Sequence, residues 1–167
     1  MRCSECGREI PADRALTVDD RPICRECLHP GVDPIPFWPI GVVANDRDRP
    51  DDGFGVTGSD RSEIRLLPTM ARFVAGLADE THLTVVWIPH RARPVRTRFA
   101  RGWDGRMVGP FASRTPDRPT PIAVTDVELV AVDGTTLQVR GLDAIDGTPV
   151  LDLKVAPAGL KRRKRDG

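Results

Sequence analysis

The segment from residue 122 to residue 157 constrains the fold more than any other part of the chain. Two β-rich stretches, residues 122–132 and 135–139, flank Asp133-Gly134, and an Asp-Gly pair between such stretches is a strong hairpin signal. Residues 150–155 then alternate apolar with polar side chains, as a half-buried strand does. The segment therefore predicts antiparallel β-structure built from consecutive short strands.

The middle of the chain supplies the remaining strands. Residues 40–44, 63–67 and 81–88 are short runs rich in apolar and β-branched side chains. Between them, residues 69–77 predict a short helix, because their apolar residues recur at three- and four-residue spacing: Met70, Phe73, Val74 and Leu77. We expect a mainly β protein whose six or seven strands form a small antiparallel β-barrel, since closure removes exposed strand edges.

The cysteines form two Cys-x-x-Cys pairs that are separated by 17 residues. Each pair can bind one side of an ion, and the spacer returns the second pair to complete a tetrahedron. Gly7 allows the tight turn after the first pair. The spacing predicts a structural Zn²⁺ site; a disulfide pair and a redox dithiol are the alternatives. The predicted metal ligands are Cys3, Cys6, Cys24 and Cys27.

Composition changes along the chain divide it into four parts. Residues 1–30 are expected to form a four-cysteine zinc-binding module that resembles a zinc ribbon. Residues 31–38 form a Pro-rich linker, and we expect Phe37 and Trp38 to pack onto the following domain. Residues 39–157 form the barrel domain. Residues 158–167 form a basic tail, expected to be disordered and to add salt-sensitive affinity for RNA.

Two polar segments are expected to form the two sides of one site. In residues 109–122, four prolines stiffen the loop that displays Arg114 and Arg118, which suit an anionic ligand. In residues 143–154, an Asp-Gly turn lies among further polar side chains: Asp143, Asp146, Thr148 and Asp152. We expect these arginines and carboxylates to converge.

A cluster of six arginines lies between residues 91 and 106, and Asp104 is the only acidic residue among them. In the predicted strand 95–99, alternation places Arg96 and Arg98 on one face, and Trp103 follows on a loop. Such a surface suits RNA phosphates and bases, or it is a solvated basic edge that deters aggregation. Because the net charge is only +1, any RNA-binding surface must come from such local clustering.

The two polar segments also carry a family resemblance. Residues 111–122 read Phe-Ala-Ser-Arg-Thr-Pro-x-Arg-Pro-x-Pro-Ile, and residues 143–154 read Asp-x-x-Asp-Gly-Thr-Pro-Val-Leu-Asp-x-Lys. This pattern resembles the TsaA-like family, also called the TrmO family, and the resemblance covers residues 39–157. It implies a small β-barrel that binds S-adenosylmethionine as a homodimer. The implied reaction is methylation of the exocyclic amine of threonylcarbamoyl-adenosine next to the anticodon of tRNA.

The resemblance also implies roles for individual residues, although it names no catalytic side chain. Candidates for binding the cofactor are His90, Arg91, Arg114, Val124, Asp143, Ala144, Ile145 and Asp146. Candidates for binding the substrate are Arg96, Arg98, Arg118, Asp152 and Lys154. An exposed imidazole at a strand end is the alternative for His90, and a salt-bridged structural rim is the alternative for Arg118, Asp152 and Lys154.

Residues 45–62 depart from the family pattern, because a Pro-Arg-Gln element that helps to hold the cofactor is absent from them. Residues 53–58 match G-x-G-x-x-G, but no strand precedes them and no helix follows, so they predict a loop. The departure leaves two other functions open. One is a methyltransferase that acts on another substrate, and the other is a noncatalytic zinc-containing adaptor.

The overall composition bounds the cellular setting. The chain has 167 residues, of which 40% are hydrophobic and 29% are charged, as in soluble globular proteins. It has no run of eighteen apolar residues, and its N-terminus reaches Cys3 without a signal peptide. We therefore expect a cytoplasmic protein that does not contact membranes. The family resemblance implies tRNA as its partner.

Overall fold

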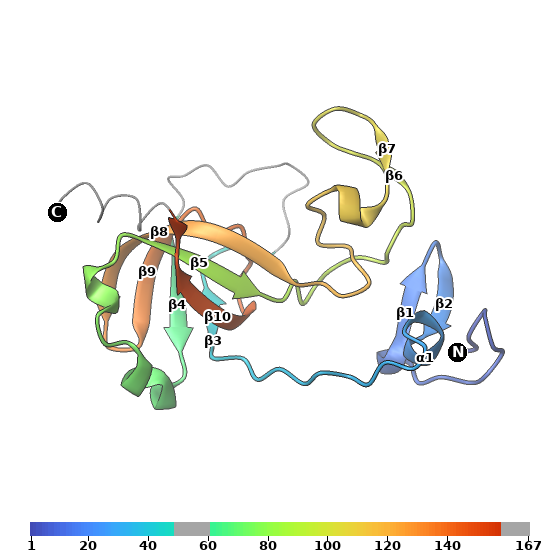
Figure 1. The fold of residues 1–167 in the computed structure, drawn as a ribbon, viewed down its shortest axis with the longest axis horizontal. Coiled ribbons are helices and arrows are strands. Elements are labelled where there is room, and N and C mark those ends of the chain that lie inside the picture. The colour runs from blue at the N-terminus through green and yellow to red at the C-terminus, as the bar shows by residue number, and fades with distance from the viewer. Residues whose placement is uncertain (49–60, 158–167) are drawn as a thin grey trace. The chain divides into compact units, whose positions relative to one another are not determined.

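The computed structural model describes residues 1–48 and 61–157 (Figure 1). The G-x-G-x-x-G match, most of the segment without Pro-Arg-Gln and the basic tail 158–167 lie outside the described residues. Internal contacts divide the chain into two units. We call Met1–Pro36 with Arg91–Pro121 the cysteine unit, and Phe37–His90 with Ile122–Gly167 the barrel unit. The boundaries predicted from composition stay a prediction, and the contacts add that residues 91–121 belong with the N-terminal segment.

The barrel unit contains a closed antiparallel barrel in the order β10-β3-β4-β9-β8-β5 (Figure 1). This result confirms the predicted mainly β fold. The strands are β3 (Gly41–Ala44), β4 (Arg61–Leu66), β5 (His82–Trp87), β8 (Ala123–Asp133), β9 (Thr136–Arg140) and β10 (Pro149–Val155).

Strands β3 and β4 approach each other closely at Gly41. A Cβ on Gly41 would lie 2.5 Å from the backbone oxygen of Arg65, so only glycine fits there.

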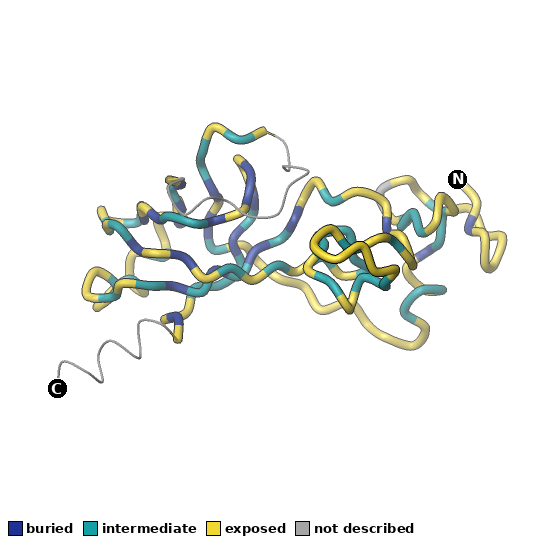
Figure 2. Tube along the Cα trace, turned by 90° about the horizontal axis from the view of Figure 1, so that it is seen from above, coloured by how far each residue is buried: buried dark blue, intermediate teal, exposed yellow. Residues whose placement is uncertain are grey.

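Most of the barrel core comes from side chains that alternate between buried and less buried positions along the strands. In β5, Leu83, Val85 and Trp87 are buried, while the residues between them are only partly buried. Figure 2 shows buried positions recurring along the strands of this unit. Removing such apolar side chains from water contributes about 1.5–3 kcal/mol for each large residue. The core contains Val43, Ile64, Leu66, Leu83, Val85, Trp87, Val127, Leu129, Leu137, Val139, Leu142, Ala144 and Val150.

The predicted hairpin joins β8 to β9. Asp133 pairs with Thr136 across the turn, and Gly134 has a φ of 57°, which glycine adopts without strain. On its other side, β8 pairs with β5, from Glu128 opposite His82 to Ala123 opposite Trp87. Residues 91–121 therefore leave and re-enter the barrel from the paired ends of two neighbouring strands.

The predicted helix at residues 69–77 is wrong in type. The segment forms a 3-10 helix over Pro68–Phe73 and a second one over Leu77–Asp79, and Gly76 between them has a φ of 78°. Phe73 is 72% exposed, whereas Met70, Val74 and Leu77 pack against the core. The spacing that suggested one apolar face therefore holds for three of the four residues.

The cysteine unit contains two small antiparallel hairpins. The first pairs β1 (Ala15–Val18) with β2 (Arg21–Cys24) and continues into α1 (Arg25–Leu28). The second pairs β6 (Phe99–Ala100) with β7 (Met107–Val108). Two single 3-10 turns, Ala12–Arg14 and Pro110–Ala112, complete its regular structure.

Two predictions from the sequence are wrong, one about a strand at residues 95–99 and one about the packing of Phe37 and Trp38. The predicted strand 95–99 does not form, because Val95 makes only an isolated parallel bridge to Val18 and regular pairing begins at Phe99. Phe37 and Trp38 do not bury against the following domain, since their exposures are 57% and 84%. Within residues 1–48 and 61–157, no helix is both long enough and apolar enough to cross a membrane.

Candidate functional site

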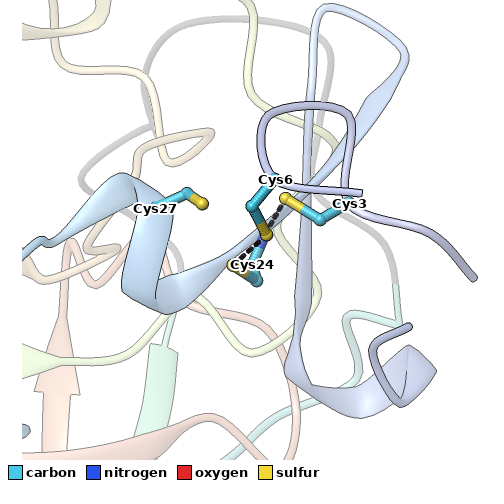
Figure 3. Close-up of side chains that lie close together, drawn as sticks. All are labelled: Cys3, Cys6, Cys24 and Cys27. Carbon is cyan, nitrogen blue, oxygen red and sulfur yellow. Dashed lines mark hydrogen bonds between the residues drawn. The ribbon is translucent and has the colours of Figure 1, made fainter. Parts of the chain in front are cut away.

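The four cysteine side chains gather in one cluster (Figure 3). Cys3 and Cys6 lie on the N-terminal turn that Gly7 closes with a φ of 72°, Cys24 ends β2, and Cys27 lies in α1. Their sulfur atoms all lie within 4.8 Å of one another, and the Cys6 and Cys24 sulfurs are 3.9 Å apart. A tetrahedral ion with Zn–S bonds of about 2.3 Å requires sulfurs about 3.8 Å apart. The donor set and its spacing therefore fit Zn²⁺.

The surroundings of the cluster divide the thiols into two kinds. The backbone N–H of Cys24 donates to the Cys3 sulfur at 3.3 Å and lowers the pKa of Cys3 to about 6. The Arg8 side chain lowers the pKa of Cys6. Burial raises the pKa of Cys24, and hydrogen bonding with Cys24 raises the pKa of Cys27 to about 12. An ion that binds all four sulfurs must therefore displace protons from the second pair.

The acidic segment lies on the barrel unit as a tight loop between β9 and β10. Gly141 and Gly147 have φ values of 83° and 72°. The backbone N–H of Gly147 donates to the Val43 oxygen at 2.8 Å, and the N–H of Val43 donates to the Thr148 oxygen at 2.9 Å. These bonds hold the loop against β3, so its carboxylates occupy fixed positions at the barrel.

Asp143 is oriented by two neighbouring strands. Its Oδ1 accepts a hydrogen bond from the Thr125 hydroxyl at 2.5 Å, and Thr125 in turn accepts one from the Trp87 indole N–H at 3.1 Å. Thr125 belongs to β8 and Trp87 to β5. Because one oxygen is fixed in this way, the carboxylate keeps lone pairs on the other oxygen for a ligand donor.

Asn45, just after β3, fixes the other end of the loop. Its backbone N–H donates to Asp146 Oδ1 at 3.1 Å, and its side-chain amide donates to the Ala144 oxygen at 2.9 Å and to the Ser62 hydroxyl at 3.0 Å. These bonds border an open groove of about 570 Å³ on the barrel unit. The groove is lined by Ala44, Asn45, Asp46, Arg61, Ser62, Glu63, Arg65, Gln138 and Asp146.

Other residues of the acidic segment face the core. Ala144 and Ile145 are buried, so they can contact a ligand only through their backbone. Thr148 is fully buried, and its hydroxyl has no hydrogen-bond partner among the residues that the structure describes. Thr148, which the sequence placed among the polar side chains of one side of the site, is therefore not on the surface.

The remaining candidates of the barrel unit lie on its surface. Val124 of β8 is 48% exposed and pairs with Val86, so the backbone around it belongs to the barrel wall. His90 is exposed beyond the end of β5. On β10, the Lys154 ammonium lies 2.5 Å from Asp152 Oδ2, so these two candidates neutralise each other as an exposed ion pair.

The arginine candidates lie in the cysteine unit and have different surroundings. Arg91, Arg98 and Arg114 are exposed. Arg118 donates to the Ser113 oxygen at 3.4 Å and stacks over the Phe111 ring at 5.6 Å. The predicted convergence of Arg114 with Asp143 and Asp146 stays a prediction. The roles of all these residues in binding stay predictions as well.

Arg96 differs from the other arginines. Its two terminal nitrogens donate to both oxygens of Asp20, at 2.6 and 2.8 Å, and this bidentate pair raises the pKa of Arg96. Its charge is therefore directed to the β1–β2 turn.

Sequence reasoning missed the residues that position the acidic loop. Asn45 directly follows a predicted buried strand, and polar residues at strand ends are a usual source of site residues, so its place was a usable signal. Thr125 and Ser62 gave no such signal, because each lies inside a strand and meets its partner only in the folded barrel.

Comparisons with known proteins agree with this arrangement. The sequence profile described as "tRNA-methyltransferase O N-terminal domain" matches residues 43–157. A "Probable S-adenosyl-L-methionine-binding protein" of Methanothermobacter thermautotrophicus is 36% identical over 118 residues, which cover 70% of this chain and 85% of the relative. Another protein of that name, from Archaeoglobus fulgidus, is 41% identical over 92 residues, which cover 55% of this chain and 25% of the relative.

Bacterial proteins extend the comparison. The "tRNA (adenine(37)-N6)-methyltransferase" of Escherichia coli is 35% identical over 111 residues, which cover 60% of this chain and 47% of the relative. A crystal structure of TrmO from P. aeruginosa superposes with a TM-score of 0.61 at 25% identity, covering 77% of this chain and 57% of that chain. The chain thus spans about half the length of these two proteins. Since the family profile covers most of the chain, including the entire acidic loop and every barrel strand except the start of β3, the protein belongs to the TrmO family, through its tRNA-methyltransferase O N-terminal domain.

Proposed function

We propose that the barrel binds S-adenosylmethionine and that the protein transfers its methyl group to the exocyclic amine of adenine 37 in tRNA. Support comes from the family profile, from the names of the relatives and from the acidic loop. The observation that carries the proposal is the fixed orientation of Asp143 and Asp146, which Thr125 and Asn45 hold before any ligand arrives. Preoriented acceptors lower the cost of ordering a bound nucleoside.

The proposed roles follow from the chemistry of the side chains. Asp143 and Asp146 accept hydrogen bonds from ribose hydroxyls or from the adenine amine of the cofactor, and the backbone of Ala144 and Ile145 completes the contact. Arg114 pairs with the cofactor carboxylate. His90, Arg91 and the backbone of Val124 contribute further cofactor contacts.

The reaction needs little covalent chemistry from the protein. S-adenosylmethionine supplies a methyl group that its sulfonium already activates. The side chains therefore hold the target amine in line with the sulfur–methyl bond at near-attack distance and exclude water. With the cofactor bound, the amine nitrogen would gain the methyl carbon, S-adenosylhomocysteine would leave with the electrons of the broken sulfur–carbon bond, and the amine proton would pass to solvent. We propose no nucleophilic side chain.

The finer features of the proposal concern the substrate and the assembly. We infer that the target adenosine carries a threonylcarbamoyl group and that Arg98, Arg118, Asp152 and Lys154 orient the RNA. We also propose a homodimer in the cytoplasm. Cys3, Cys6, Cys24 and Cys27 are proposed to bind structural Zn²⁺, with no open coordination position for chemistry.

The names of the archaeal relatives favour a second candidate function. Those names state S-adenosylmethionine binding and give no RNA substrate. A protein of this second kind binds the cofactor and methylates another molecule.

Calorimetric titration with S-adenosylmethionine tests cofactor binding. We expect the wild type to bind and Asp143→Asn to bind about tenfold or more weakly, because a hydrogen bond to a charged acceptor contributes about 1.5–3 kcal/mol. Asp126→Asn is the matched control, since Asp126 also accepts a 2.5 Å bond from a threonine, Thr84, on the same barrel but lies outside the acidic loop. Its affinity should equal that of the wild type.

Transfer of labelled methyl to tRNA tests the substrate. We expect label in tRNA that carries threonylcarbamoyl-adenosine and much less in tRNA that lacks the modification. Cofactor binding without labelled tRNA would support the second candidate. A wild type that does not bind S-adenosylmethionine would refute both candidates.

A further inference from the structure

Residues 91–121, here called the arginine loop, have very little core of their own. Val95, at 4% exposure, is the only buried side chain in this fully described segment. Figure 2 shows the cysteine unit largely as exposed and partly buried chain. A segment of this length with one buried residue does not gain enough from apolar burial to offset its conformational entropy. Its order must therefore come from other contacts.

Residues 1–30, here called the cysteine module, are the part of the cysteine unit that carries the four cysteines. Val95 lies where the arginine loop meets the β1–β2 hairpin of this module. Its backbone N–H donates to the Thr17 oxygen at 2.9 Å, and its oxygen accepts from the Asp19 N–H at 2.9 Å. These bonds form the parallel bridge between Val95 and Val18. The one buried residue of the loop is thus also its backbone attachment to β1.

The β1–β2 turn adds two carboxylates to this attachment. Asp19 accepts from the Thr97 backbone N–H at 2.9 Å and from the Thr97 hydroxyl at 2.5 Å. Asp20 binds both terminal nitrogens of Arg96. The Thr97 hydroxyl lowers the pKa of Asp19, as expected for a carboxylate that accepts strong hydrogen bonds.

The backbone of the turn is shaped to present these two carboxylates. Asp19 and Asp20 have φ values of 46° and 63°, as in the two-residue type I′ turn that joins hairpin strands. Asparagine or aspartate followed by glycine is the usual pair at such positions. Asp20 stands where glycine is usual, and its contact with Arg96 gives this aspartate a role beyond turn formation.

The attachment continues through the loop to the arginines of the proposed site. Arg93 donates from its backbone to Asp117 Oδ1 at 2.7 Å and from its Nε to Asp117 Oδ2 at 3.2 Å. This pair joins the start of the loop to the segment that carries Arg114 and Arg118. A continuous set of contacts thus leads from the turn to that segment.

We propose that the Asp19-Asp20 turn of the cysteine module is an intramolecular brace that orders the arginine loop. The module then acts as a positioning element for that loop. Arg96 belongs to the brace, so its role is positioning and not direct contact with substrate. Any effect of the brace on catalysis rests on the proposed function of Arg114 and Arg118. The existence of the brace does not depend on that function.

Amide hydrogen exchange of the full zinc-loaded chain tests the brace. The variant Asp19→Gly with Asp20→Gly deletes both carboxylates and keeps the positive φ values, so the hairpin and bound zinc should be retained. The informative amides are Arg93 and Arg101, which bond within the loop at a distance from the mutated turn. We expect their exchange to accelerate by more than about threefold while barrel amides such as Leu83 stay unchanged. A smaller acceleration would overturn the proposal.

Two further variants keep the test informative. Glu9→Gln removes an exposed carboxylate of the same module that pairs with Arg2, and it should leave the loop amides unchanged. If the double variant loses zinc or barrel protection, Thr97→Val replaces it, because it deletes one hydroxyl contact to Asp19 and leaves the turn intact. It should accelerate the same amides by more than about twofold, and unchanged exchange would overturn the brace.

The same variants separate this proposal from the proposed function. In the double variant, the KM for tRNA should rise more than kcat falls, since the loop that orients substrate is loosened. A wild type without methyltransferase activity would refute the proposed function and leave the exchange result as the test of the brace.

Discussion

The barrel unit and the cysteine unit are stabilised in different ways. Apart from Cys3, Cys24 and Val95, every buried apolar residue of the described chain belongs to the barrel unit. The barrel also closes on itself, so each of its six strands pairs with two neighbours and no strand edge is left unpaired. The cysteine unit instead depends on a sulfur cluster and on carboxylates that bind arginines and threonines. The comparison shows that the chain combines a unit ordered by apolar burial with one whose contacts are mainly a cluster of four cysteine sulfurs and pairs of charged and polar side chains.

Replacing one cysteine should give the largest difference between the two units, because it should unfold one and leave the other intact. We expect Cys24→Ser to lose stoichiometric zinc and to unfold the cysteine unit, because binding of a structural zinc site supplies about 10 kcal/mol or more of folding free energy. Barrel amides should exchange as in the wild type. Metal analysis and hydrogen exchange of the same sample measure both effects. Full zinc content with an ordered cysteine unit would contradict the proposed metal site, and Ser4→Ala, which alters a neighbouring contact to Pro22, is the control.

A cavity in the barrel core should destabilise the barrel unit and leave the cysteine unit unchanged. Leu83 is fully buried in β5, so Leu83→Ala should lower the free energy of unfolding of the barrel by about 2–5 kcal/mol. Zinc content should not change. Urea unfolding followed by tryptophan fluorescence gives the stability, because Trp87 is the one buried tryptophan of the described chain and becomes exposed on unfolding. Leu67→Ala at an exposed position is the control. A loss of zinc in Leu83→Ala would show that the two units are not independent.

A smaller effect is expected from acid. The Arg101 side chain holds the pKa of Asp104 at about 2, below its ordinary value of 3.8. Because the folded pKa is depressed, the stabilisation is present above pH 3.8 and is lost as pH falls towards 2. The protection of the β6–β7 amides, measured relative to their intrinsic exchange rates at each pH, should therefore fall over this range in the wild type. In Asp104→Asn the loss of protection between pH 3.8 and 2 that comes from this carboxylate should be missing. An identical pH profile for both proteins would contradict the stabilisation by the Arg101–Asp104 pair.

Sequence reasoning succeeded where structure follows from local periodicity. The β5 residues Leu83, Val85 and Trp87 alternate in the sequence as they do in the barrel, and Asp133-Gly134 marks its hairpin directly. The helix at residues 69–77 was wrong because a short run of apolar residues does not distinguish one helix from two 3-10 turns. The barrel was therefore predictable, and the segments around it were less so.

The candidate site was predictable in part. The spacing of the cysteines sufficed to place Cys3 and Cys24 in one cluster, since paired thiols recur at ligand spacing. The strand predicted at residues 95–99 was wrong because the alternation of Arg96 and Arg98 reflects no sheet face, and Arg96 instead pairs with Asp20 far away in the sequence. Such polar pairings between distant segments leave no periodic signal, and the same holds for Asn45 and Asp146.

The pairing of Trp87 with Ala123 has a consequence for protein engineering. The two strand ends from which residues 91–121 depart are already hydrogen-bonded neighbours, so a short turn could replace the whole excursion at little entropic cost. The barrel thus has a natural insertion point, where foreign loops can be grafted or the native one trimmed while the ladder on either side stays intact.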